Sequence, residues 1–293
     1  MKKLFVLIFL ATGLSSMSQV AINTDGTTPD NSAMLDVKST AKGFLPPRMT
    51  TTQRNAIAAP AEGLLVYNTD EKALNMFTGT AWKSLIPVPD FECGLSVTVN
   101  HLVGRGVAPV LKTVTYGTVN GIAGEAAKCW ITKNLGADQQ ATVVNDPTEA
   151  SAGWYWQFNR KQGYKHDGTT RTPNITWTNF INENLDWQAA NDPCAIELGF
   201  GWRLPTVSEW TNVDAGGNWN NYVDGFNSEL NLHLAGLLDY SNGSLLYRGA
   251  NGYYWSSSRS NAASGWALVF GFGDIYIDNN SKTGGHSIRC IRE

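Results

Sequence analysis

The residue types that most often carry catalysis or bind metals are sparse in this chain and widely spaced. Its four cysteines form no CxxC pair and its four histidines are scattered, so the spacing typical of a zinc site is missing. Neither GxSxG nor HExxH occurs, and no histidine is placed as an obvious partner for a serine. We therefore predict no catalytic residues and expect that the protein is not an enzyme. The histidines are His101, His166, His233 and His286.

Calcium is the ion that the remaining oxygen-bearing residues would suit best. Asp274, Asp278 and Asn280 lie close together in the sequence, and calcium prefers oxygen ligands. Their spacing departs from that of an EF-hand loop, because Lys282 stands where another carboxylate would help. Exposed turn polarity explains these residues more simply, so we expect no metal and no cofactor, with calcium unsupported by any motif.

The four cysteines suit an oxidising compartment, where an even number predicts two disulfides. Three connectivities are open, and we favour Cys93 with Cys129 and Cys194 with Cys290. On the chain-entropy model, loops of these lengths would stabilise the fold by about 4 and about 5 kcal/mol.

The N-terminus predicts export. Lys2 and Lys3 precede an apolar run at residues 4–10, and the small residues of Ser16-Met17-Ser18 mark a cleavage site, so residues 1–18 are expected to be a signal peptide. No later apolar stretch reaches 18 residues, which predicts a mature chain without a membrane span. The net charge of −3 gives no broad basic face, which argues against nucleic acid as a partner. We expect a secreted protein or one held at the outer cell surface.

Composition divides the mature chain. Ten of the eleven tryptophans lie from Trp130 onward, which indicates a separate aromatic-rich domain at residues 129–293. Residues 19–88 are expected to be a β-rich adaptor region that ends at the proline-marked linker IPVPD, residues 86–90, and residues 89–128 a connecting β-ribbon.

Local patterns predict the elements of the first part of the chain. Thr50 and Gln53 have the spacing of a capping box and predict a short helix. Residues 64–85 show strand, turn, strand, turn and strand, and residues 95–119 contain two alternating stretches expected to pair as a ribbon.

The aromatic-rich domain is predicted to be α+β. Residues 163–174 are expected to form a long surface loop, and residues 182–190 a helix that Pro193 ends. Thr206 and Glu209 form a second capping box and start another helix. Strands with glycine and asparagine turns follow, including LHLAGLLDY, YYWSSS, GWALVFGF, DIYID and HSIRCIRE.

Residues 129–293 contain the motifs GWRLPTVSEW, GYYWSSS, GWALVF and HSIRCIRE, in this order. These motifs resemble the Fibrobacter succinogenes major paralogous domain and the related Legionella collagen-like C-terminal domain. The resemblance implies a C-type-lectin-like fold with two helices and a twisted antiparallel sheet, more distantly similar to the formylglycine-generating enzymes. The disulfide pattern of these families fits Cys194 and Cys290.

Two departures limit what this resemblance implies. Formylglycine generation depends on a cysteine-based copper site, whereas the cysteines here are better explained as disulfides. Calcium-dependent lectins use EPN or QPD with WND, and this chain has Trp219-Asn220-Asn221 instead.

Residues 34–85 are similar to adaptor segments of exported Bacteroidetes proteins and of phage tail-fibre-like proteins, which implies an assembly role.

In the stretch YYWSSSRSNAASGWALVFGFGDIYI, strand alternation predicts one buried face and one face that shows serines. Aromatic, serine and asparagine side chains on a rigid sheet suit adaptable binding. We predict a secreted or surface-associated adhesion protein that recognises a glycan or a protein ligand through this domain. The alternatives are an extracellular enzyme related to the sulfatase-modifying group and a purely structural fibre subunit. The candidate ligand-binding residues are Trp255, Ser257, Arg259, Asn261, Trp266, Tyr276, Asp278 and Asn280.

Overall fold

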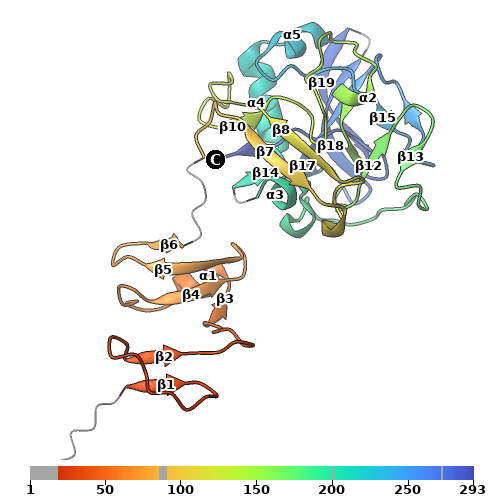
Figure 1. Ribbon diagram of the computed structural model, residues 1–293. Helices are drawn as coiled ribbons and strands as arrows, with labels where there is room; N and C mark the ends of the chain where they lie inside the picture. The colour runs from red at the N-terminus through yellow and green to blue at the C-terminus, as the bar shows by residue number, and fades with distance from the viewer. Residues whose placement is uncertain (1–18, 86–90, 200, 272) are drawn as a thin grey trace, which may run out of the picture. The chain divides into compact units, whose positions relative to one another are not determined.

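The computed structural model describes residues 19–85, 91–199, 201–271 and 273–293. The predicted signal peptide and the IPVPD linker lie outside these ranges. The chain forms two compact units, residues 1–87 and 88–293 (Figure 1). The described parts of both are mostly strands with few helices, so the predicted α+β class is confirmed.

The first unit contains a two-stranded parallel pair and a four-stranded sheet. The capping box predicted at Thr50 and Gln53 is present. The pair is β1 (Val20–Ile22) with β2 (Leu35–Val37), and the sheet follows the order β3 (Arg48–Met49), β4 (Leu65–Asn68), β5 (Ala73–Phe77), β6 (Trp82–Ser84), with α1 (Thr51–Asn55) after β3. The predicted three-stranded meander is therefore confirmed.

In the second unit, the predicted ribbon is a hairpin of β7 (Val97–His101) and β8 (Lys112–Tyr116). Val99, Val114 and Tyr116 join the core of this unit. A four-stranded sheet brings distant parts of the chain together in the order β14 (Trp202–Arg203), β20 (Ile291–Arg292), β10 (Cys129–Ile131), β9 (Thr118–Val119). The first strand of the aromatic-rich domain thus pairs with the last strand of the chain.

The sheet that carries the predicted binding residues has the order β17 (Gly252–Arg259), β18 (Ser264–Gly271), β19 (Asp274–Ser281). One face packs Tyr254 and Leu268 in a cluster with Trp210 of α4 (Val207–Gly217). The opposite face packs Trp255 and Val269 in a cluster with Phe158. Both faces are covered in the middle of β17 and β18, where Ser256 is completely buried and Ser257 and Ser258 are half-buried, so the predicted face of exposed serines is wrong there.

The remaining elements surround these sheets (Figure 1). They are α2 (Glu149–Ala152), α3 (Pro193–Leu198), α5 (Tyr222–Asn227), the sheet of β11 (Tyr155–Trp156), β12 (Gly163–His166) and β13 (Arg171–Thr172), the pair β15 (Leu237–Leu238) and β16 (Leu245–Leu246), and two 3-10 turns at Val103–Arg105 and Ala189–Asn191.

Several predicted elements differ from the structure. Residues 163–174 contain the hairpin β12–β13 rather than a long loop. No α-helix forms over 182–190, because the Glu183 and Trp187 amides donate to the carbonyls of Ala262 and Ser257. LHLAGLLDY contributes only the two residues of β15, and HSIRCIRE only the two of β20.

Candidate functional site

The structure does not bring the eight predicted binding residues together on one surface. Tyr276, Asp278 and Asn280 occupy alternate positions of β19 and therefore share a face. Trp266 pairs with Asn279 and so lies on the other face of the sheet. Only part of the predicted set can contact one ligand.

Trp255 cannot contact a ligand in this fold, because its side chain is completely buried. Its ring stacks on His286 with ring centroids 3.9 Å apart, and its Nε1 donates to the Trp156 carbonyl oxygen over 2.7 Å. The assignment of Trp255 to a binding surface is wrong. Core clusters pack against both faces of β17 at this point, so its aromatic side chains are buried although the sequence alternates.

The other predicted residues of β17 and the following turn have local structural contacts. The Ser257 amide donates to the Pro205 carbonyl, and Ser257 is half-buried. The Arg259 amide donates to Asp186 Oδ1 over 2.9 Å, and its guanidinium lies 3.6 Å from that oxygen. Asn261 Oδ1 accepts from the amides of Ala263 and Ser264, which shapes the β17–β18 turn.

A row of tyrosines is the better candidate for a contact surface on this sheet. Tyr253 of β17 pairs with Val269, and Val269 pairs with Tyr276, so the three side chains share one face. Burial raises the pKa of the Tyr253 hydroxyl, and the nearby Tyr276, Tyr247 and Asp278 add to this effect. Because tyrosine gives large contact area with few rotatable bonds, this group suits recognition. We call Tyr247, Tyr253, Tyr276 and Asp278 the tyrosine surface.

Sequence reasoning found two members of the tyrosine surface and missed Tyr247 and Tyr253. The pairing of β17 with β18 places Tyr253 on the same face as Tyr276, and the sequence of one strand does not reveal how it pairs with the next. Tyr247 comes from the connection before β17 and is about half exposed, at 53%.

The aspartates considered for calcium do not converge. Asp274 and Asp278 lie four residues apart on the extended strand β19, which separates them by about 13 Å along the strand. Asp278 Oδ1 also accepts from the Asn279 amide. Within the described ranges, no three His, Cys, Asp or Glu side chains gather closely enough to hold a metal ion.

The disulfides join Cys93 to Cys129 and Cys194 to Cys290, which is the connectivity favoured from the sequence. Cys194 lies at the start of α3, where Asp192 caps the helix by accepting from the amides of Cys194 and Ala195. Cys290 precedes β20, so the second disulfide ties this helix to the C-terminal strand.

The first unit exposes an apolar face that the single chain does not cover. Because β1 and β2 are parallel, Val20 lies beside Leu35 and Ile22 beside Val37, all on one face of the pair. Their side chains are 51%, 53%, 58% and 40% exposed, respectively. An isolated two-stranded pair is marginal in water, so a partner that covers this face would stabilise it. We call these four residues the N-terminal apolar face.

A stability measurement tests whether Trp255 is a core residue. Trp255→Phe is expected to lower the free energy of unfolding by about 2 kcal/mol, because it removes buried ring volume and the bond to the Trp156 carbonyl. Trp266→Phe, at a half-buried position, should cost less. Urea unfolding of both variants checks this; equal, negligible losses would contradict the assignment of Trp255 to the core.

Residues 21–100, that is 80 of the 293 residues, match a protein family described as a phage tail like trimerisation region. The match contains β1, β2 and the N-terminal apolar face, apart from Val20. It points to self-assembly and to a structural or fibre-like surface protein, and it agrees with the adaptor role expected for residues 34–85. No curated protein matches the chain. In the described ranges, no helix is long and apolar enough to cross a membrane.

Proposed function

We propose that this protein is a trimeric, fibre-like adhesion protein of the cell exterior. Residues 21–100 assemble three copies, and the C-terminal domain of residues 129–293, with a C-type-lectin-like fold, contacts an extracellular glycan or protein without catalysis. Two disulfides and the tail-like region are consistent with an extracellular or surface location.

The observation that carries this proposal is the N-terminal apolar face within a segment similar to a trimerisation region. Four exposed aliphatic side chains on one small face are costly in a monomer. Burying them between copies removes apolar surface from water, at about 25 cal/mol per Å². Assembly thereby supports strands that are too short to be stable alone.

The C-terminal domain is proposed to bind through the tyrosine surface. Its antiparallel sheet, its helices α4 and α5 and the pairing of β10 with β20 support the lectin-like fold. The disulfide between Cys194 and Cys290 holds α3 beside the end of the chain. The strands β17 and β18 pack against core clusters on both faces, which makes their sheet a rigid support. A rigid aromatic surface loses little entropy on binding.

The oligomeric state tests the assembly part of the proposal. Residues 19–293 are expected to have a molar mass three times that of one chain by light scattering after size exclusion. Ile22→Asp with Val37→Asp should give monomers, because each copy would bring two buried charges into the contact. Leu111→Asp, an equally apolar but unrelated exposed position, is the matched control and should stay trimeric.

A monomeric unsubstituted protein across micromolar concentrations would refute the trimer, as would a double variant that remains trimeric. The binding part is tested separately by screening a glycan array with the same protein, with and without calcium. Tyr276→Ala is expected to weaken the capture of ligands that use the tyrosine surface.

A further inference from the structure

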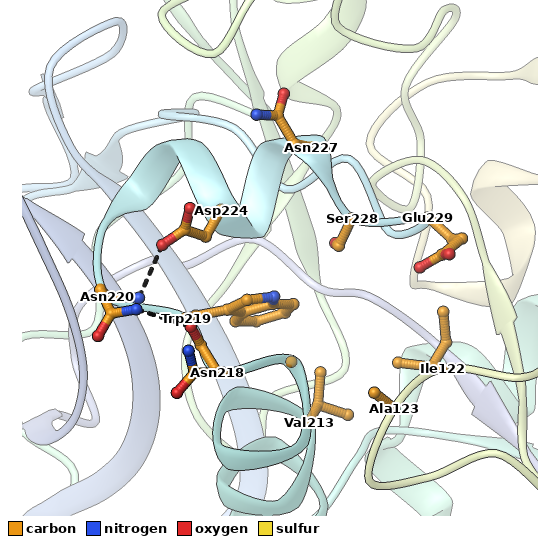
Figure 2. A pocket seen from close by; sticks show the side chains of 11 residues that line it. Ile122, Ala123, Val213, Asn218, Trp219, Asn220, Asp224, Asn227, Ser228 and Glu229 are labelled. Atoms are coloured by element: carbon orange, nitrogen blue, oxygen red, sulfur yellow. Dashed lines mark hydrogen bonds between the residues drawn. The ribbon is translucent and has the colours of Figure 1, made fainter.

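A second surface of the C-terminal unit has the character of a ligand site. A groove of about 440 Å³ lies between the C-terminal end of α4, helix α5 and the loop at Ile122 and Ala123 (Figure 2). This volume falls within the range of small-molecule pockets, about 300–1,000 Å³. Figure 2 shows the Trp219 ring lying across the middle of the groove, with Asn220 at one end and Glu229 and Ile122 at the other.

The turn between α4 and α5 fixes the position of Trp219. Asn218 ends α4 in the left-handed conformation, with φ of 49°, and the Trp219 amide donates to the Asp214 carbonyl over 3.1 Å. Asp224 Oδ2 then accepts from the amides of Asn220 and Asn221, at 2.8 and 3.1 Å. The backbone on both sides of Trp219 is therefore held by hydrogen bonds.

Gly217 gives the Trp219 ring its place against the end of the helix. A Cβ atom at this position would lie 2.5 Å from Trp219 Nε1 and 2.8 Å from Cδ1. These separations are too short for any side chain, so a larger residue would displace the ring. The Trp219 indole can occupy this place in the groove because residue 217 is a glycine.

The lining combines an apolar surface with unused polar groups. Trp219 and Val213 belong to one hydrophobic cluster, and Ile122 extends it to the facing loop. Within the described chain, Trp219 Nε1, the Asn218 side-chain amide and the Glu229 carboxylate make no hydrogen bond, whereas the Asn218 backbone amide donates to the Ala215 carbonyl. None of the eleven lining residues is Lys, Arg or His, so the groove offers no cation to a phosphate or a carboxylate.

We propose that this groove binds a neutral saccharide, with one sugar ring lying on the face of Trp219. A pyranose has an apolar C–H face and a rim of hydroxyl groups that both donate and accept. The C–H face matches the indole, which packs over the buried Val213 and Ile122 side chains, and the hydroxyls match the Asn218 side-chain amide and the Glu229 carboxylate. Calcium is not needed, because the protein supplies both the donors and the acceptors.

This groove is separate from the tyrosine surface, and the inference holds whether or not the N-terminal region forms trimers. An array of glucose-, galactose-, mannose- and N-acetylglucosamine-terminated glycans is probed with residues 19–293 in the presence of EDTA. At least one glycan class is expected to be retained. Trp219→Ala should weaken that binding at least about tenfold, as loss of a central aromatic anchor does. Gly217→Ala should also weaken it by moving the ring.

Tyr240→Ala is the matched control, because Tyr240 is an exposed aromatic residue outside both surfaces, and it should bind like the unsubstituted protein. If Trp219→Ala does not fold, Asn218→Gly with Glu229→Gln takes its place, since glycine tolerates the left-handed position. No retained glycan in EDTA would overturn the proposal, as would binding lost in Tyr276→Ala and kept in the groove variants. Failure to trimerise would leave this result unaffected.

Discussion

Replacing Cys194 and Cys290 together by alanine is expected to lower the free energy of unfolding of the C-terminal unit by about 5 kcal/mol. The disulfide closes a loop with a sequence separation of 96 residues, so its loss frees a large part of the unfolded chain. Both cysteines are completely buried, and their removal also leaves unfilled space in the core that contains Trp202 and Ile288. Urea unfolding followed by tryptophan fluorescence measures the loss.

The pair Cys93 and Cys129 provides the comparison, because it closes a shorter loop with a separation of 36 residues. Its double alanine variant should lose about 4 kcal/mol, less than the first variant. Thiol titration of the unfolded, unreduced protein is expected to find no free thiol. Two free thiols, or a stability loss below about 1 kcal/mol in the Cys194 and Cys290 variant, would contradict the assignment.

Stability is expected to fall steeply between pH 6.5 and pH 4 because of two buried histidines. Burial lowers the pKa of His233 to about 3, helped by the charge of Arg289, and burial lowers the pKa of His286 to about 3. In the unfolded chain each pKa is near 6.5, so below that pH the unfolded state binds more protons. The stabilisation is complete above pH 6.5 and declines as the pH falls toward 3. At pH 4 each histidine accounts for a loss of about 3 kcal/mol.

His286→Phe isolates one of these contributions, since the new ring can keep the stacking contact with Trp255. The free energy of unfolding is measured at pH 7 and pH 4, and the difference should be smaller in this variant by about 3 kcal/mol. Tyr240→Phe serves as the control and should keep the original pH dependence. An unchanged difference in His286→Phe would show that this imidazole titrates normally.

Asp192 changes the pH dependence of stability in the opposite direction to the two histidines. Burial raises the pKa of its carboxyl group to about 6, against the amides of Leu204, Ala195 and Cys194 that donate to it. The folded state therefore binds more protons between about pH 4 and 6, and this group alone makes stability fall as the pH rises through that range. The two histidines together outweigh it, so the net loss still occurs on the acid side.

Predictions from the sequence succeeded where neighbouring residues decide the structure. Thr50 with Gln53 and Thr206 with Glu209 form their capping boxes because each contact closes within one helical turn. The prediction that Pro193 ends a helix is wrong. Pro193 stands in the first turn of α3, directly after the N-cap Asp192, and proline favours this position because its missing N–H is not needed there.

Features that depend on distant partners could not be obtained in this way. The segment around Trp187 is not helical, because the Trp187 backbone amide donates to the carbonyl of Ser257, a residue 70 positions later. Arg289 is completely buried and donates to the Leu230 carbonyl and to Asn134 Oδ1, although its motif reads as an ordinary strand end. The tyrosine surface and the Trp219 groove also arise from register and from helix placement. Residue types alone do not reveal which side chains the strand register and the helix placement bring together.

The outer edge of β19 pairs with no strand in the described chain. Open edges of this kind are templates for intermolecular sheet growth, the first step toward insoluble aggregates. Asp274 and Asp278 are exposed on this strand, and a second copy docking there would bring like charges together. The two carboxylates therefore oppose the edge-to-edge pairing of two copies at β19.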